Sequence, residues 1–261
     1  TLADHMTEAG FDPAALRSGR ALLDPARIRA FVELHIEQGP VLVERGAPVG
    51  VVTAIRGNIR YRFARIRGQT THAGGVPRAS RRDAVLAGAE LAHRLEAEWI
   101  RLEDAGADLV LTIGQFATDP DQHGVTKVPG ALDFTLDFRS IAPEVLDHFD
   151  GFLRDVADDI ARRRGVDIDL GRATRAAEAE MTPDLISGLI AAAGRAGVPA
   201  LEIASGGGHD CAVFAGLGVP SAMIFVRNEN GSHNPDEAMA FDDFAAAWRV
   251  LRTWAEDYLA G

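Results

Sequence analysis

The sequence has 261 residues, of which 47% are apolar and 25% charged, a composition typical of a soluble globular protein with one large or two modest domains. Its 38 acidic and 27 basic residues give a formal net charge of −11, which argues against nucleic acid or an anionic membrane as a partner. A single cysteine excludes an internal disulfide, and no apolar run reaches the ~18–20 residues that span a bilayer. The expected location is the cytoplasm.

Residues 1–53 are expected to begin as helix and to continue into a buried segment that ends at His35. A Gly-Pro pair then breaks the chain. A short helix is predicted over residues 41–46 and a strand over residues 49–53.

The spacing of apolar residues in 54–172 indicates a separate structural unit, with Ile59, Tyr61 and Phe63 expected on one buried strand face. In chain order, the patterns predict a strand at 59–63, a helix at 80–102, strands at 109–113 and 132–138, a helix at 143–164 and a strand at 166–170. This βαββαβ order is the ferredoxin-like signature, in which the helices cover one face of the sheet.

Residues 173–261 return to α/β character. The patterns predict a helix from 182 to about 197, strands at 201–203 and 219–226, and a helix at 242–258. The fold class is therefore α/β: a domain formed by 1–53 and 173–261 is interrupted by a βαββαβ domain at 54–172. The chain would cross between the domains at 53/54 and 171/173.

Two histidines, His35 and His233, each lie where a buried element meets a polar turn, with carboxylates such as Glu37 and Glu237 nearby. Imidazole and carboxylate groups are common ligands of zinc-like metals. A single histidine is more often a structural hydrogen-bonding residue, and no short metal-binding spacing is present. The residues alone leave both interpretations open.

Three further positions have a functional and a structural interpretation. His72 lies on a glycine-rich loop and would stabilise an oxyanion or cap the next helix. Arg139 ends the clearest strand and would bind a substrate carboxylate or pair with Asp137 or Glu144. The glycines of segment 205–210 lack a phosphate-loop lysine and would let backbone approach a small ligand, with Asp210 capping the next helix.

Taken together, the motifs resemble the M20-type metal-dependent amidases of the hydantoinase/carbamoylase group, over essentially the whole chain. Members include N-carbamoyl-L-amino acid hydrolases, allantoate amidohydrolases and β-ureidopropionases. The motifs are ELHIEQGP (33–40), GVVTAI (50–55), THAGGVP (71–77), RRDA (81–84), VPG (128–130), DFRS (137–140), SGGGHD (205–210) and GSHNPDE (231–237).

The resemblance implies a catalytic α/β domain that carries a ferredoxin-like lid and dimerisation domain, in a homodimer. It also implies hydrolysis of linear amide or ureido C–N bonds in small carboxylate substrates. Two divalent ions, zinc or manganese, would lower the pKa of a bound water and polarise the scissile carbonyl.

The resemblance also implies residue roles. His35 would bind one metal ion and His233 the other. His72 would stabilise the oxyanion by reaching into the site of the partner subunit. Arg139 would hold the substrate carboxylate, and the remaining substrate contacts would come from Gln38, Asn58, Thr126, Gly207 and His209.

The sequence departs from the family pattern in two ways. Thr126 stands where the family has an amide side chain, thirteen residues before Arg139, which leaves the substrate open. The family's other metal ligands and its general base, a histidine, an aspartate and a Glu-Glu pair, lie in an N-terminal segment. Before His35, no acidic residue or histidine lies in a motif that matches those of the missing ligands and general base.

We therefore expect the sequence to be the C-terminal two-thirds of such an enzyme. A non-catalytic fragment that dimerises through the lid is the alternative. An M20 aminoacylase or dipeptidase is disfavoured because those relatives lack the HIEQGP string at this place.

Overall fold

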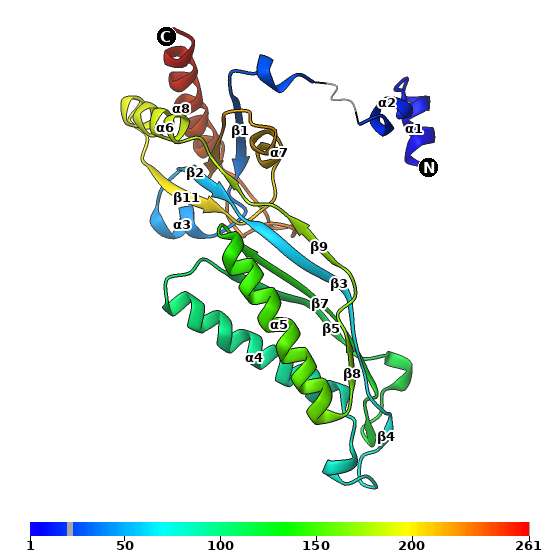
Figure 1. The fold of residues 1–261 in the computed structure, drawn as a ribbon. Coiled ribbons are helices and arrows are strands. Elements are labelled where there is room, and N and C mark those ends of the chain that lie inside the picture. Colours follow the sequence, from blue (N-terminus) through cyan, green and yellow to red (C-terminus); the bar gives the residue numbers. More distant parts are fainter. Residues whose placement is uncertain (20–22, 261) are drawn as a thin grey trace.

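The structure, a computed structural model, describes residues 1–19 and 23–260. Two five-stranded sheets dominate it, one after the other along the long axis of the molecule (Figure 1). The prediction of a mixed α/β protein is confirmed. Within the described residues, no helix combines the length and apolar character needed to cross a membrane.

The first sheet has mixed strand directions and the order β1-β12-β2-β10, with β11 also paired to β2. Its strands are β1 (Phe31–Ile36), β2 (Val49–Ile55), β10 (Ala179–Glu180), β11 (Ala200–Ser205) and β12 (Ser221–Val226). Every residue of β12 is buried because this strand is central and both faces of the sheet are covered.

Helices cover both faces of the first sheet. On one face, α6 (Pro183–Ala196) and α8 (Phe241–Ala260) pack over a core that includes Val51, Ile224 and Leu189. On the other face, α3 (Val41–Arg45) and α7 (Asp210–Gly216) enclose a smaller core with Val52, Phe225 and Cys211.

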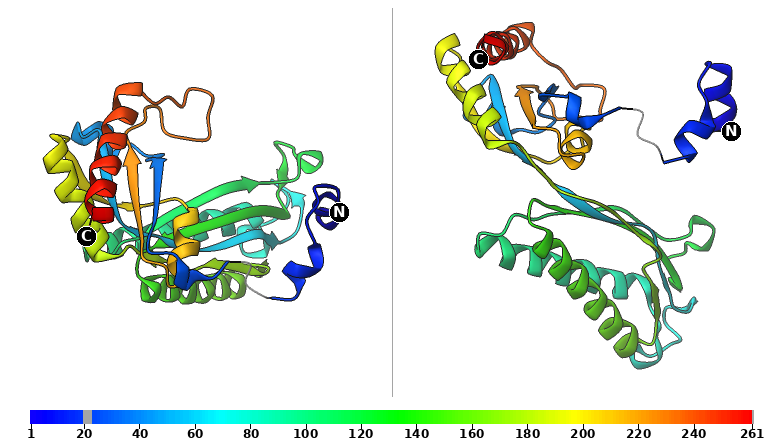
Figure 2. Two further views of the ribbon diagram at one scale, coloured as in Figure 1. Left: turned by 90° about the horizontal axis from the view of Figure 1, so that it is seen from above. Right: turned by 45° about the horizontal axis from the view of Figure 1, so that its top comes forward.

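The second sheet has the order β5-β7-β3-β8, with β9 also paired to β3. Its strands are β3 (Gly57–Arg67), β5 (Val110–Ala117), β7 (Ala131–Ser140), β8 (Asp167–Asp169) and β9 (Ala173–Ala176). The long helices α4 (Ala84–Asp104) and α5 (Pro143–Arg164) lie on one face (Figures 1 and 2). Their apolar sides bury the alternate residues of β7, which include Phe134 and Phe138.

Short elements complete the chain. The hairpin of β4 (Thr71–His72) and β6 (Lys127–Val128) lies at the end of the molecule far from the first sheet (Figure 1). The N-terminal helices α1 (Leu2–Glu8) and α2 (Pro13–Arg17) lie apart from both sheets and have no buried residues (Figures 1 and 2). Single 3₁₀ turns lie at Pro25–Arg27, Arg78–Ser80 and Pro120–Gln122.

The chain passes twice between the two sheets. It leaves the first sheet between Ile55 and Gly57 and returns between Ala176 and Ala179. Helix α4 begins four residues later than predicted, at Ala84, because the side chain of Asp83 caps it by accepting the N–H of Leu86 at 3.0 Å.

One expected core residue lies on the wrong face. The alternation predicts Phe63 on the same buried face as Ile59 and Tyr61, but it is 83% exposed. A register shift between Tyr61 and Ala64 interrupts the alternation of β3, and Ala64 is buried in its place. The strand then continues to Arg67.

Candidate active site

The carboxylate of Glu37 stabilises the start of α3. Its Oε1 accepts the N–H of Val41 and its Oε2 accepts the N–H of Leu42, both at 2.8 Å. The residue is buried, and a Cβ on Gly39 would lie 2.9 Å from its Oε1. Because both oxygens satisfy backbone N–H groups at a helix start, Glu37 has a structural role here.

Gln38, the next residue, is fixed by residues from the opposite end of the sequence. Its backbone N–H donates to Asn228 Oδ1 at 2.8 Å, and its Nε2 donates to Ser232 Oγ at 3.0 Å. The backbone has a φ of 62°, a left-handed conformation that is uncommon for a side-chain-bearing residue. These contacts leave the side-chain Oε1 directed towards Gly207, 3.3 Å from where a Cβ on that glycine would lie.

A pocket of about 510 Å³ opens beside Gln38, between the first sheet and the near end of the second. Four residues to which the sequence assigned a site role line it: Gln38, Arg139, Gly207 and His233. They come from the exits of β1 and β11, from β7 and from the loop after β12. The fold thus gathers residues from four separate parts of the chain around one cavity.

Arg139 joins the two sheets at this pocket. Its Nε and Nη2 donate to the two carboxylate oxygens of Asp137, at 2.9 and 2.8 Å, and its Nη1 donates to the carbonyl of Gly206. Burial alone would raise the pKa of Asp137, but hydrogen bonds from Arg139 and Arg60 outweigh it and hold that pKa below its usual value. Arg139 therefore pairs with Asp137, as the structural interpretation of the sequence predicts, and it also lines the pocket.

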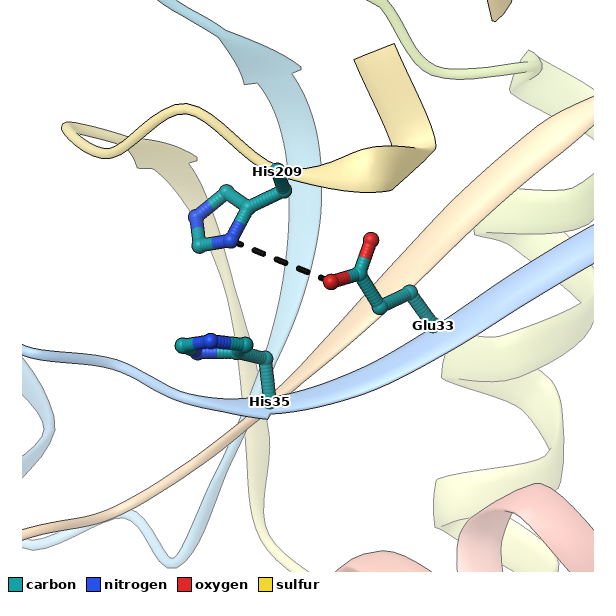
Figure 3. A group of neighbouring side chains, drawn as sticks. All are labelled: Glu33, His35 and His209. Atoms are coloured by element: carbon teal, nitrogen blue, oxygen red, sulfur yellow. Dashed lines mark ion pairs between the residues drawn. The ribbon is translucent and has the colours of Figure 1, made fainter. Parts of the chain in front are cut away.

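A second polar group consists of Glu33, His35 and His209. One potential ligand atom from each lies within 4.8 Å of the others (Figure 3). Glu33 and His35 alternate along β1, so both point to the same face of the sheet, and His209 comes from the loop before α7. Two imidazoles and a carboxylate suit a divalent metal ion of the zinc class.

His209 is neutral at physiological pH. Burial, and then the neighbouring His35, lowers the pKa of His209 to about 4. Its side chain is 3% exposed and its ring meets that of His35 edge-on, with ring centres 4.6 Å apart. A neutral imidazole keeps a lone pair for a metal ion or for a substrate N–H group.

Sequence reasoning missed Glu33, although its spacing from His35 placed both on one strand face. It also assigned the wrong cap to α7. Asp210 makes no cap hydrogen bond, and the backbone N–H of Cys211 instead donates to Glu33 Oε2 at 2.8 Å. Glu33 of β1 therefore takes the capping role that was predicted for Asp210. The sequence around α7 cannot predict a partner that comes from a distant strand.

His233 lines the pocket but does not join the Glu33–His35–His209 group. It is exposed, with a φ of 62°, and its backbone N–H donates to Glu237 Oε2 at 3.3 Å. Its role as a metal ligand stays a prediction.

Like His35 and His209, three further predicted residues do not line the pocket. Asn58 is buried on β3, directly across from Arg139 on β7. His72 and Thr126 lie together at the distant hairpin, where the N–H of Ala73 donates to the carbonyl of Thr126 at 2.7 Å. The Nδ1 of His72 accepts the N–H groups of Gly74 and Gly75, at 3.1 and 3.0 Å, which leaves Nε2 as its outward-facing donor.

Comparison with known proteins places the chain in a family. Residues 4–257 match the model of peptidase family M20/M25/M40. The chain therefore belongs to this family. In structure, it is similar to an amidase of the hydantoinase/carbamoylase family from Burkholderia multivorans, with a TM-score of 0.77, 32% identity, and coverage of 87% of this chain and 54% of that chain.

In sequence, the chain is 38% identical to the N-carbamoyl-L-amino acid amidohydrolase of Geobacillus stearothermophilus, over 96% of this chain and 59% of that protein. It is 37% identical to the allantoate amidohydrolase of Escherichia coli strain K12, over 86% of this chain and 53% of that protein. The chain thus spans somewhat more than half the length of these relatives.

Proposed function

We propose that the complete protein hydrolyses a linear amide or ureido C–N bond in a small substrate that carries a carboxylate, such as an N-carbamoyl amino acid, allantoate or ureidopropionate. The observation that carries this proposal is the pocket, in which Gln38, Arg139, Gly207 and His233 surround about 510 Å³. The names of the similar proteins, which act on N-carbamoyl-L-amino acids and allantoate, support it.

The residues in and beside the pocket divide into two functions. Arg139 supplies the positive charge for the substrate carboxylate, and Asp137 fixes the plane of its guanidinium group. Gln38 and His209 flank Gly207, where the absence of a side chain leaves room for the substrate beside both polar groups. This arrangement would orient the scissile bond relative to the carboxylate.

The donor set fits a metal-assisted reaction. His35 and His233 are the proposed ligands of two divalent ions, zinc or manganese. When bound, such ions supply an acidic water and polarise the scissile carbonyl. The protein's own residues would hold the substrate, exclude bulk water and offer the neutral imidazole of His209.

We further propose that the second sheet with α4 and α5 is a ferredoxin-like lid and dimerisation domain. The hairpin that carries His72 and Thr126 lies far from the pocket of its own chain (Figure 1). In a homodimer, it would serve the pocket of the partner subunit, where the outward Nε2–H of His72 would stabilise a developing oxyanion. A cytoplasmic location is part of the same proposal.

The direct test is hydrolysis by the complete gene product loaded with Mn²⁺ or Zn²⁺. Ammonia release is measured from N-carbamoyl amino acids, allantoate and ureidopropionate. We expect turnover of one of them, and loss of at least about 30-fold in kcat/KM in Arg139→Ala, because a buried charge pair with the substrate is removed. Arg67→Ala, an exposed arginine on the far part of β3, is the matched control and should leave the rate unchanged.

Two results together would reject the proposed function. One is the absence of turnover of all three substrates. The other is activity on a different amide that survives both His233→Ala and Arg139→Ala.

A further inference from the structure

We propose that a cavity between the start of α4 and the end of α5 binds a small anion that carries a phosphate or diphosphate group. This basic cavity has a volume of about 670 Å³, and its charged lining residues are Arg78, Arg81, Asp83, Arg163 and Arg164. It lies in the second sheet's part of the molecule, at the end far from the first sheet (Figure 1). Binding there requires no hydrolytic activity, so it can be tested apart from the proposed function.

The basic cavity concentrates positive charge in an acidic protein. The chain has a formal net charge of −11, yet four arginines and only one carboxylate line this cavity. That carboxylate, Asp83, is already used within the fold, because its Oδ1 accepts the N–H of Leu86 at 3.0 Å. Guanidinium groups match the oxygens of a phosphate in geometry as well as in charge. The lining therefore favours a multivalent oxyanion.

Arg78 gives the clearest sign of an available donor. It lies on the 3₁₀ turn Arg78–Ser80 and is exposed. Among the residues that the structure describes, its side chain has no hydrogen-bond or ion-pair partner. All of its guanidinium N–H groups are therefore free to bind a ligand, and its removal breaks no contact within the fold.

On the opposite side of the cavity, Arg163 and Arg164 share carboxylates that cannot neutralise both of them. Arg164 Nε donates to Glu90 Oε2 at 2.6 Å, and Arg163 Nη2 donates to the other oxygen of the same carboxylate. Arg163 Nε also donates to Asp159 at 2.9 Å, but Asp159 is paired with Arg94 as well, at 2.7 Å. Three arginines thus face two carboxylates, which leaves one positive charge uncompensated.

Arg81 is held in place by neutral groups. Its Nε donates to the carbonyl of Val76 at 2.9 Å, and its Nη2 donates to the carbonyl of Ala73. These bonds fix the guanidinium plane without cancelling its charge, which is the arrangement of a preorganised binding residue. They also connect the cavity to the segment that leads from His72 to α4.

The size and shape of the cavity narrow the class of ligand. A volume of about 670 Å³ lies within the range of sites for small molecules. The arginines approach from two elements, the segment before α4 and the end of α5, so an anion with several oxygens can contact both sides. Free phosphate or diphosphate and a phosphorylated metabolite share this chemistry.

The test measures anion binding to the purified complete protein after treatment with a chelator, so that no bound metal ion attracts the anion. Titration calorimetry at low salt uses inorganic diphosphate and glucose 6-phosphate as probes. We expect at least one probe to bind with a Kd of about 100 μM or tighter, and Arg78→Ala and Arg164→Ala each to weaken it by at least about tenfold. Tighter binding of one probe assigns the ligand to the free anions or to the phosphorylated metabolites.

Matched controls separate this site from general attraction to arginine. Arg249→Ala removes an exposed arginine without a partner among the described residues, as Arg78→Ala does, and Arg252→Ala removes one whose Nε donates to a glutamate. Arg139→Ala removes the arginine of the substrate pocket. All three variants should bind the probe as the wild type does.

Circular dichroism establishes that each variant is folded, and Arg78→Ala tests the proposal even if Arg164→Ala fails to fold. The absence of binding at about 1 mM of either probe overturns the proposal. It is equally overturned if folded Arg78→Ala binds as the wild type does, or if Arg139→Ala is the variant that loses binding, because the anion then occupies the substrate pocket.

Discussion

At the scale of single residues, the pocket depends on what Gly207 lacks. A Cβ at this position would lie 3.1 Å from His209 Nε2 and 3.3 Å from Gln38 Oε1, closer than ordinary packing allows. The neighbouring Gly208 has open space at the corresponding position. The two glycines therefore differ in function although the sequence presents them as one run.

This difference gives a direct prediction. Gly207→Ala should lower kcat/KM by about tenfold, because Gln38 and His209 must move by a few tenths of an ångström and no longer orient the substrate. Gly208→Ala should leave it within about twofold. Equal effects of the two substitutions on steady-state kinetics would show that Gly207 does not shape the pocket.

The positions of single residues also explain why the sequence predicted only part of the candidate site. Gln38, Arg139, Gly207 and His233 lie in motifs, and the fold brings all four to one pocket. Glu33 lies in a motif too, but its partners are His209 and the N–H of Cys211 on a distant segment. Its role follows from the approach of that loop to β1, which spacing along the chain cannot reveal.

At the scale of elements, strand and helix patterns predicted most of the architecture. The alternation of β7 and the apolar run of β12 correspond to burial on one face and on two faces. The short strands β9 and β10 were missed because their conformation depends on pairing with β3 and β2. The full length of β3 was missed because its register shift breaks the alternation.

The start of α3 provides a prediction for one element. Glu37→Gln should lower the free energy of unfolding by about 1–3 kcal/mol, because the amide can accept only one of the two N–H groups that Glu37 now satisfies. Glu44→Gln changes an exposed glutamate of the same helix and should cost about 0.5 kcal/mol or less. Denaturant titration measures both, and similar losses for the two variants would contradict the assigned role of Glu37.

The contact between α4 and α5 predicts that the stability of the folded protein depends on pH. Glu98 of α4 accepts hydrogen bonds from Arg101 at 2.7 and 2.8 Å, and it lies 2.6 Å from His148 Nε2 on α5. The bonds from Arg101, and then that from His148, lower the pKa of Glu98 to about 2. A carboxylate whose pKa is lower in the folded than in the unfolded protein stabilises the folded state at pH values above its unfolded pKa, which is near 4.5.

The stability that Glu98 contributes should therefore be complete above about pH 4.5 and should disappear as the pH falls towards about 2. In Glu98→Gln, this part of the acid dependence should be absent, whereas Glu96→Gln, at an exposed position of the same helix, should retain it. Thermal unfolding at a series of pH values measures the effect. Parallel stability curves for the wild type and Glu98→Gln would contradict it.

At the scale of the whole molecule, the distance between the pocket and the His72 hairpin is the feature that most favours a dimer. Light scattering should give a mass of twice the 27.9 kDa of the chain. A mass of one chain at every concentration would leave His72 and Thr126 without a pocket to serve.

The central proposal is that Arg139 recognises a substrate carboxylate in the pocket between the sheets. The most direct measurement compares an N-carbamoyl amino acid with its uncharged carboxamide in the complete, metal-loaded protein and in Arg139→Ala. We predict that the wild type prefers the acid by at least about 30-fold in kcat/KM and that the variant loses this preference. The same preference in both proteins would contradict the account.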